Sequence, residues 1–305
     1  MDSILMQHIM NWLVLGSIYT LIAIGFSLLF GVLNVIHFSH GDVSMVAPFV
    51  MLASLQALLG AVGANVGLGA IALAMALAIL ATGLVGLGAD RLVIRRFRNS
   101  PAMMALVATV ALGTVVRELI RSFYPQGSNP KAFPSLVQGF VPIGEGRLPL
   151  QPLMIIVITV AVVGFMYWLL QKTPIGIRIR AAAEDRETAR LMAIRPDRVF
   201  AFTFFLASAV GALGALFFAS HAGVVRFDFG VQLGLIGFSA AVIGGLGSMN
   251  GAILGALAIA GIEAIVQANM ADGASYRLVF AFLLVIFMLC IRPWGLLGKP
   301  VIEKV

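Results

Sequence analysis

The sequence predicts an all-α protein of the polytopic membrane class, a bundle of about eight or nine membrane-spanning helices. Hydrophobic residues make up 61% of the 305 residues and charged residues only 11%, whereas a soluble domain carries about 25% charged residues. The mean hydropathy is +1.04. Apolar runs recur along the whole sequence, and no hydrophilic stretch is long enough to form a separate soluble domain. We therefore expect residues 1–305 to form a single transmembrane domain.

Nine apolar runs come close to the length of about 20 residues that an α-helix needs to cross a bilayer. They cover residues 9–33, 43–60, 67–89, 101–122, 152–171, 199–221, 232–248, 251–270 and 274–291. The 232–248 run is short and little room for a loop follows it. Non-helical backbone at membrane depth is tolerated only where protein or water surrounds it. We therefore expect one or two broken or re-entrant helices, and the number of full crossings stays open.

The basic residues predict the orientation of the bundle. Most of the 20 Lys and Arg residues lie in three segments, 91–98, 172–198 and 292–304. Cytoplasmic segments of membrane proteins are enriched in Lys and Arg. Nine crossings with the N-terminus outside place all three segments, and the C-terminus, on the cytoplasmic side. Topology thus explains the net charge of +7, and we expect no nucleic-acid partner.

The outer loop, residues 123–151, contains five prolines and several glycines. Proline removes a backbone donor and clashes with the preceding helical turn, so this loop cannot form a long helix. The loop is either a simple connector or a surface for an external partner. The sequence does not decide between these two roles.

The inner loop, residues 172–198, predicts a short amphipathic helix over residues 181–194. Good helix formers fill this range, acidic residues lie toward its start, and Arg190 and Arg195 lie toward its end, which suits the helix dipole. A helix that lies on lipid usually carries more bulky apolar side chains. We therefore favour a groove on a cytoplasmic protein as its partner, with the lipid surface as the alternative.

Polar residues interrupt the apolar stretch Ile24–Asp42. Its last nine positions include the polar or small residues Asn34, His37, Ser39, His40, Gly41 and Asp42. Polar groups within membrane segments usually face a cavity, so we favour a solute path, with polar capping of a helix break as the alternative. Metal sites need three or four converging ligands, and the sequence offers only His8 and His221 besides these histidines. We predict no metal site and no catalytic residues, because no nucleophile–base set or phosphate-binding loop is present.

A second break follows at residues 244–250. The tetrapeptide IGFS occurs at 24–27 and again at 236–239, and each copy precedes glycines and an asparagine, Asn34 or Asn250. Transporters are often built from repeats whose broken helices meet at a central site, so a structural repeat is a hypothesis here.

We expect Glu263 and Gln267, and likewise Arg117, Glu118 and Arg121, to make helix-stabilising contacts; direct solute contact is the alternative.

Four sequence blocks carry a resemblance to a known family. They are GFSLLFGVLNVIHFSHGD near the start, RAAAEDRETARLMAIRPDRVFAFTF in the inner loop, GFSAAVIGGLGSMNGAILGALAIAGIEA, and IRPWGLLGKPVIEKV at the end. In this order they resemble the LivH-type permease subunits of branched-chain amino acid ABC importers. The resemblance implies a bacterial cytoplasmic (inner) membrane location and contact with membrane lipid. It implies three kinds of protein partner: a second homologous permease, two cytoplasmic ATPases that carry ATP and magnesium, and a solute-binding protein outside. No cofactor is expected on this chain itself.

The resemblance also implies roles for individual residues. The 181–194 helix is similar to the element that docks on an ATPase, which implies coupling roles for Glu184, Asp185, Thr188, Ala189, Leu191, Met192 and Ala193. The two breaks are similar to the lining of the translocation path, which implies path roles for Asn34, His37, His40, Gly41, Asp42, Gly244, Gly245, Gly247, Ser248 and Asn250.

The sequence departs from the family at three places. A tyrosine- and glycine-containing stretch usually follows the His-Gly pair, where this chain has Asp42 and, six residues on, Pro48, which should kink its span. The position of Ala193 is commonly glycine. These departures leave the solute open among branched-chain amino acids, other amino acids, amides and urea. An ATP-independent carrier or channel using Glu263 or Asp42, and a membrane enzyme using His37 and His40, are weaker alternatives.

Overall fold

The computed structural model describes residues 2–34, 36–62, 67–98, 100–143, 146–270 and 273–298. This part of the chain is mostly α-helical, as predicted, with two small two-stranded sheets. The helices are α1 (Asp2–Leu33), α2 (His40–Ser44), α3 (Val46–Val62), α4 (Leu68–Ala89), α5 (Arg95–Phe97), α6 (Ala102–Phe123), α7 (Leu150–Lys172), α8 (Pro174–Glu184), α9 (Arg186–Leu191), α10 (Pro196–Ala222), α11 (Phe229–Gly244), α12 (Met249–Asn269) and α13 (Gly273–Ile291). The strands are β1 (Lys131–Ala132), β2 (Phe140–Ile143), β3 (Gly146–Pro149) and β4 (Val224–Val225).

Each of the nine predicted spans coincides with helical structure. In the described residues, seven helical segments are long and apolar enough to cross a membrane, and α11 and the apolar part of α13 are shorter. The architecture is that of an all-α polytopic bundle, as expected. The number of full crossings stays a prediction.

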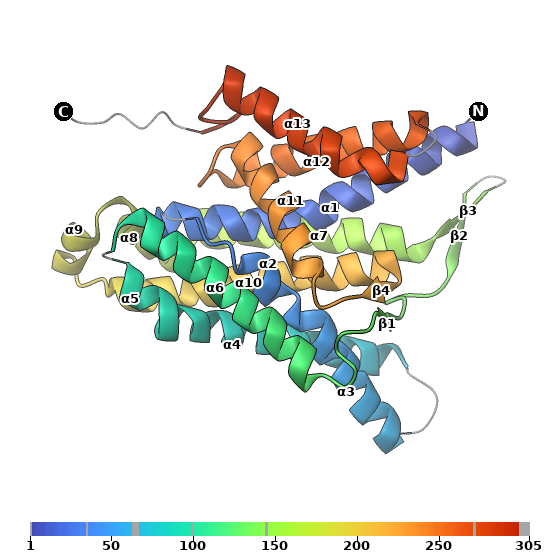
Figure 1. Ribbon diagram of the computed structural model, residues 1–305, viewed down its shortest axis with the longest axis horizontal. Coiled ribbons are helices and arrows are strands. Elements are labelled where there is room, and N and C mark those ends of the chain that lie inside the picture. Colours follow the sequence, from blue (N-terminus) through green and yellow to red (C-terminus); the bar gives the residue numbers. More distant parts are fainter. Residues whose placement is uncertain are drawn as a thin grey trace.

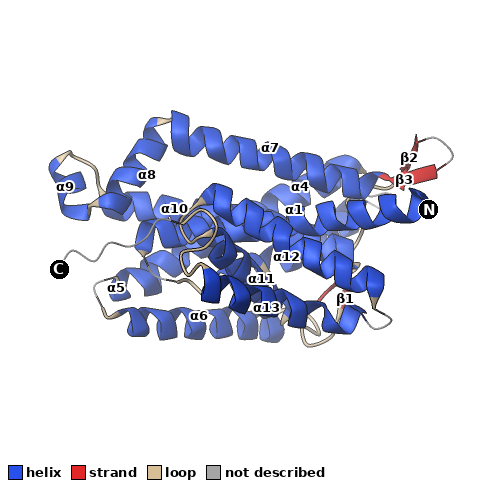
Figure 2. Ribbon diagram, turned by 90° about the horizontal axis from the view of Figure 1, so that it is seen from above, coloured by secondary structure: helices blue, strands red, loops and turns tan. Residues whose placement is uncertain are grey.

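Helix α1 lies at the centre of the bundle, where α10, α11 and α12 pack against it (Figures 1 and 2). Ile18, Tyr19, Leu21 and Ile22 are fully buried. Helices α6 and α7 lie at the periphery, and many of their apolar side chains are exposed, as expected of surfaces that face lipid or another membrane protein.

Stripes of small residues bring α4 and α10 together. Ala74 and Ala78 of α4 and Ala207 and Ala215 of α10 are fully buried, and the two helices pack against each other. A methyl group on Gly86 of α4 would overlap Ser208 and meet the Phe204 carbonyl of α10. Small side chains allow helix backbones to approach closely in lipid. The small residues of the two helices thus allow α4 and α10 to pack closely.

The helix is interrupted just before Pro48, the residue predicted to kink its span. Helix α2 ends at Ser44, Met45 forms a turn, and α3 begins at Val46. A proline cannot donate to the carbonyl four residues earlier and clashes with it. That carbonyl belongs to Ser44, the last residue of α2, so the helix breaks where proline chemistry requires.

The outer loop forms two short sheets and no long helix, as expected from its prolines. Strand β1 pairs antiparallel with β4, where Lys131 lies opposite Val225. Strands β2 and β3 form a hairpin, where Phe140 lies opposite Pro149. Both sheets lie toward the end of the bundle where the N-terminus is found (Figure 1).

The predicted single helix over residues 181–194 is wrong. Helix α8 ends at Glu184 and a separate helix α9 runs from Arg186 to Leu191. The Asp185 side chain causes the break, because its Oδ1 accepts hydrogen bonds from the backbone N–H groups of Glu187 (2.8 Å) and Thr188 (3.1 Å). An N-cap residue has non-helical backbone, here φ −150° and ψ 114°. Helix propensity alone did not reveal this cap.

Helix α9 ends earlier than predicted because Ala193 adopts a left-handed conformation, with φ +59°. The N–H of Ile194 donates to the Ala189 carbonyl (3.0 Å), and the N–H of Ala193 donates to the Arg190 carbonyl (3.1 Å). These two bonds form a Schellman motif, whose left-handed position is usually glycine. This explains why glycine is the common residue at the position of Ala193.

Candidate functional site

The break after α1 begins at Asn34, which has a left-handed backbone with φ +54°. Its N–H donates to the Phe30 carbonyl (2.8 Å), which is the bond of a simple left-handed helix end. Asparagine is the residue that most often replaces glycine at such a position. Asn34 is exposed, so its immediate role is to end α1.

His37 and Ser39 form a buried polar pair inside the break. The Ser39 Oγ lies 2.9 Å from the His37 Nε2, and the His37 ring meets the Phe204 ring of α10 edge to face at 5.1 Å between centroids. His37 is 4% exposed and Ser39 is fully buried. A serine beside a histidine is one element of nucleophilic catalysis, but this serine is enclosed by protein. The described residues contain no group of three or more metal-ligating side chains.

His40 begins α2 and fills a space between α1 and α10. A methyl group on Gly25 of α1 or on Gly211 of α10 would collide with the His40 ring. The Phe26 ring stands edge to face with it at 4.9 Å between centroids. In the described structure neither ring nitrogen of His40 has a hydrogen-bond partner. Two glycines in neighbouring helices thus make room for one polar ring at the bundle centre.

Asp42 contacts two further helices. Its Oδ1 lies 3.4 Å from Nε of Arg117 on α6. A methyl group on Gly113 of α6 would lie 2.5 Å from its Oδ2, and one on Gly230 of α11 would lie 2.6 Å from its Oδ1, both closer than contact distance. The negative charge of Asp42, which departs from the family pattern, is therefore balanced by the partly buried positive charge of Arg117 on α6.

Glu263, Glu118 and Arg121, three of the other polar residues noted in the sequence, each pair with another side chain. The Tyr19 hydroxyl of α1 donates to Glu263 Oε2 of α12 at 2.8 Å, and both residues are fully buried. Glu118 and Arg121 form an exposed pair at 3.3 Å on α6. Glu263 thus stabilises the contact between α1 and α12 through Tyr19, whereas the described structure shows no hydrogen bond between Glu263 and Gln267.

The second break joins α11 to α12 through Gly245 (φ +101°) and Gly247 (φ +83°), which adopt conformations that favour glycine. Ser248 caps α12 by accepting a hydrogen bond from the Gly251 N–H (3.1 Å). The chain after α13 covers this turn, because the N–H of Leu297 donates to the Gly244 carbonyl (2.9 Å). Gly244 and Gly245 are therefore required for close backbone packing.

The end of α1, just before the first break, lies against the second break. Gly31, near the end of α1, faces Gly247, and a methyl group on Gly31 would lie 3.5 Å from the Gly247 Cα. Deeper in the bundle, the IGFS copies are also adjacent, with Phe26 and Phe238 at 6.1 Å between centroids. His40 and Asp42 are buried, whereas Asn250 and Gly247 are exposed. The ten predicted path residues thus do not form one continuous surface in this structure.

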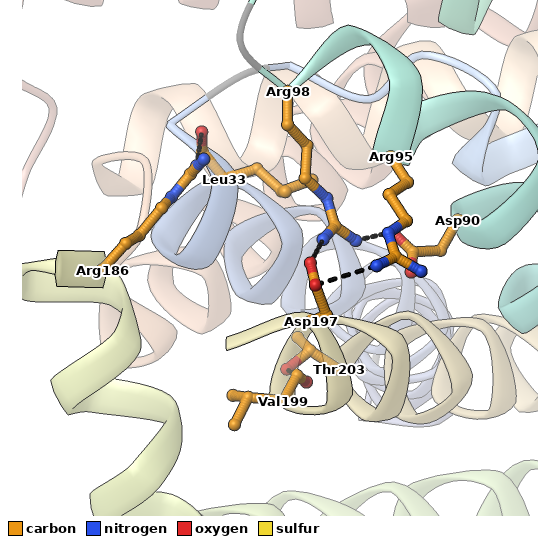
Figure 3. Close-up of polar contacts among 8 residues, drawn as sticks. All are labelled: Leu33, Asp90, Arg95, Arg98, Arg186, Asp197, Val199 and Thr203. Atoms are coloured by element: carbon orange, nitrogen blue, oxygen red, sulfur yellow. Dashed lines mark hydrogen bonds and ion pairs between the residues drawn. The ribbon is translucent and has the colours of Figure 1, made fainter. Parts of the chain in front are cut away.

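Sequence reasoning missed an ion-pair network at the end of the bundle where α5 lies (Figure 3). The Arg98 guanidinium donates to Asp90 and, at 2.9 Å, to Asp197 of α10, and Arg95 reaches the same Asp197 at 3.0 Å. Asp90 opens a five-residue π-helical turn, Asp90–Ile94. The additional residue of a π-bulge brings two residues eight apart to nearly the same face. The signal available in the sequence was a lone acid, Asp90, at the end of an apolar run.

The network borders the first break. A cavity of 20 Å³, room for about one water molecule, lies between Leu33, His37, Arg98, Thr109 and Arg186. Arg186 of α9 points its Nη2 at the Leu33 carbonyl, 3.5 Å away. The inner helix and the break are therefore in direct contact.

Six of the seven predicted coupling residues are on the surface: Glu184, Asp185, Thr188, Leu191, Met192 and Ala193. Leu191 is 86% exposed and Met192 is 73% exposed. Ala189 is only 3% exposed, so it packs inside the chain and is not available to a partner in this structure. The resemblance implied a coupling role for Ala189, and its burial was not foreseen from a single helix over residues 181–194.

Comparison with known proteins is consistent with this architecture. Residues 8–289 match the family described as the permease component of the branched-chain amino acid transport system. The chain is 31% identical to the high-affinity branched-chain amino acid transport system permease protein BraD of Pseudomonas aeruginosa, over 98% of both chains. It is 31% identical to the corresponding protein LivH of Escherichia coli, over 98% of this chain and 97% of LivH. A shorter match, 31% over 35% of the chain, is to the autoinducer 2 import system permease protein LsrC of Escherichia coli. The chain therefore belongs to the branched-chain amino acid transport permease family.

Proposed function

We propose that this chain is the transmembrane permease subunit of an ATP-driven importer that carries branched-chain or related amino acids into the cytoplasm. Similarity to branched-chain amino acid permeases over nearly the whole chain supports this proposal most strongly. The chain works with a second homologous permease, two cytoplasmic ATPases and an external solute-binding protein. ATP and magnesium belong to the ATPases, so this chain is not itself an enzyme.

The charge distribution supports an orientation with the N-terminus outside and the C-terminus in the cytoplasm of a bacterial inner membrane. Helices α5, α8 and α9 lie toward one end of the bundle, and the N-terminus lies at the other (Figure 1). Arg95 and Arg96 of α5 and Arg186 and Arg190 of α9 therefore share an end, and basic residues gather on the cytoplasmic side of membrane proteins.

The exposed surface of α9 and the turn after it is the proposed ATPase contact. Leu191 and Met192 place adjacent apolar side chains in solvent, beside the exposed polar residues Glu184, Asp185 and Thr188. Large apolar side chains that are exposed together in a polar setting commonly mark a protein contact. Ala189 is excluded from this surface because it is buried.

The solute path is proposed to run along the first break. His37, His40 and Asp42 lie near the bundle centre. Among the described residues, Nδ1 of His37 and both ring nitrogens of His40 have no hydrogen-bond partner, which favours contact with water or a polar solute. In the described structure these side chains are enclosed, so solute passage requires α2 to separate from a neighbouring helix. The Asp42–Arg117 pair favours a solute with both charges, such as an amino acid. Other amino acids, amides and urea are the competing solutes.

Reconstituting the chain in vesicles with and without its ATPases tests the proposal. Uptake of radiolabelled leucine should require ATP, both ATPases and the binding protein. Uptake that persists without ATPases would contradict the importer and favour the carrier or channel.

A matched pair of variants tests the contact surface. Met192→Glu should reduce ATPase co-purification by about tenfold, because it buries a charge in an apolar contact. Leu297→Glu changes a leucine that is 48% exposed outside α8 and α9, and it should have no such effect. Equal co-purification of both variants would contradict the assignment of the surface.

A further inference from the structure

The C-terminal end of α1 needs a positive charge that its own sequence does not provide. The last carbonyl groups of a helix lack helical partners and carry a partial negative charge. The last turn of α1 contains no basic residue. Because Asn34 turns into a left-handed conformation, the Leu33 carbonyl remains at the helix end without a helical partner.

Arg186 supplies this charge from a distant part of the sequence. Its Nη2 lies 3.5 Å from the Leu33 carbonyl oxygen, at the long end of hydrogen-bonding distance. Arg186 is the first residue of α9, directly after the Asp185 cap. Figure 3 shows its side chain extended from α9 toward the end of α1. One arginine thus spans the gap between the inner helix and the break.

Phe200 of α10 fixes the direction of this arginine. The Arg186 guanidinium lies 5.0 Å from the centroid of the Phe200 ring, and the Arg98 guanidinium lies 4.6 Å from the same centroid. Phe200 is 2% exposed. Arg98 in turn is anchored by Asp90 and Asp197. Arg186 therefore packs against the buried Phe200 ring, beside the anchored Arg98. The helix that carries Arg186, α9, is six residues long and largely exposed.

Opposing electrostatic interactions act on the Arg186 guanidinium where it contacts the Leu33 carbonyl. Partial burial, then the nearby positive charges of Arg98 and Arg190, hold the pKa of Arg186 below its usual value. The helix dipole and the Phe200 ring attract the same guanidinium. The Asp197 carboxylate also attracts it and raises its pKa, so attraction and like-charge repulsion both act on the Arg186 guanidinium.

We propose that Arg186 is a positioning residue that transmits movement of α9 to the end of α1, and so to the break that carries His37, His40 and Asp42. This inference rests on the proposed function, because an ATPase must move α9. Arg186 itself contacts neither solute nor ATPase in this mechanism. Its removal should separate ATP hydrolysis from transport without preventing assembly.

The experiment uses the reconstituted transporter with a single reporter thiol. Ile36→Cys places this thiol at a half-buried position near the start of the break, in a background where Cys290, which is exposed, is replaced by serine. Reactivity of the reporter thiol toward a water-soluble maleimide is compared without nucleotide and after trapping with ATP and vanadate. Uptake per ATP hydrolysed is measured in the same preparations.

With Arg186 present, trapping should change the reactivity of the reporter thiol. Arg186→Gln should keep ATPase co-purification and hydrolysis but lower uptake per ATP by about tenfold, the effect of losing one charge-assisted contact, and abolish the change in thiol reactivity. Arg186→Lys keeps a positive charge near the helix end and should restore part of both signals. Arg178→Gln removes an exposed charge from α8 and should behave like the parent.

Two results would overturn the proposal. The first is that Arg186→Gln keeps normal uptake per ATP and the state-dependent reactivity of the reporter thiol. The contact with Leu33 would then not transmit the movement of α9 to the end of α1. If Arg186→Gln loses its ATPases, Arg186 belongs to the docking surface or to folding. Failure of the proposed function has a different signature, since the parent complex itself would then take up leucine without ATP.

Discussion

Arg98 and Asp90 form an ion pair that is almost completely buried, with side chains 6% and 2% exposed, between a π-helical turn and α10. Both charges are shielded from water, although the sequence shows only one acid, Asp90, beside a cluster of arginines. Breaking such a pair is costly because it leaves the remaining charge buried and unpaired.

Arg98→Met should therefore lower the free energy of unfolding by about 3–5 kcal/mol. Arg95→Met is the matched control, because Arg95 is 57% exposed, and it should cost no more than about 1 kcal/mol. The double variant Asp90→Leu with Arg98→Met should recover part of the loss. Unfolding titrations in detergent measure these differences, and equal losses for Arg98→Met and Arg95→Met would refute the buried pair.

Gly41 should tolerate no side chain. A methyl group at this position would overlap the Gly230 carbonyl and the Gly234 backbone of α11, and overpacking against backbone costs about 1–3 kcal/mol or more. Gly41→Ala should thus reduce thermal stability and uptake. Gly88→Ala on α4 meets no atom within 4 Å and should stabilise the protein by about 0.5–1 kcal/mol, because alanine favours helix. Normal stability of Gly41→Ala would contradict the tight contact between α2 and α11.

Ala193→Gly should stabilise the end of α9 by about 1 kcal/mol, because a left-handed backbone costs about 1–2 kcal/mol for a residue with a Cβ atom. Gly223→Ala is the reverse test, since Gly223 has φ +69° and no atom lies within 4 Å of the position that a Cβ would take. It should destabilise by a similar amount. Hydrogen exchange of the α9 amides and the melting temperature report the two effects. No gain for Ala193→Gly would mean that strain at φ +59° is relieved in solution.

The stability that the N-terminal cap gives to α9 should depend on pH, because the capping residue Asp185 titrates. Hydrogen bonds from the Thr188 hydroxyl and from the backbone N–H groups of Thr188 and Glu187 hold the pKa of Asp185 below its ordinary value. A carboxylate with a depressed folded-state pKa stabilises the fold above its unfolded pKa of about 4 and loses this effect as the pH falls further. Hydrogen-exchange protection factors of α9 should therefore stay constant from about pH 7 to 5 and fall below about pH 4.

Asp185→Asn provides the control for this pH dependence. Asparagine is an equally good N-cap but does not titrate, so protection of α9 should be flat over the same range. An acid-induced loss that is identical in both proteins would exclude Asp185 as its cause.

Most helices of the bundle could be predicted because hydrophobic length alone specifies a membrane helix. The interruption of the helix before Pro48 followed from proline chemistry, whereas the pairing of α4 with α10 is known only from the structure. The inner loop was predicted less well. The break between α8 and α9 arises because one side chain competes with the helix backbone for hydrogen bonds. The Asp185 side chain replaces the helical partners of two N–H groups, which average propensities do not capture.

Composition and periodicity by themselves determined that this chain is a membrane-embedded all-α protein, and its sequence blocks indicated the permease family. Only the tertiary structure decided which polar groups meet. Asp42 of α2 pairs with Arg117 of α6, and Arg186 reaches Leu33 across 153 positions of the sequence. A charge in an apolar bundle must find a partner because desolvation is expensive, but the sequence shows only that a partner is needed. Which helix provides it depends on how the backbones pack.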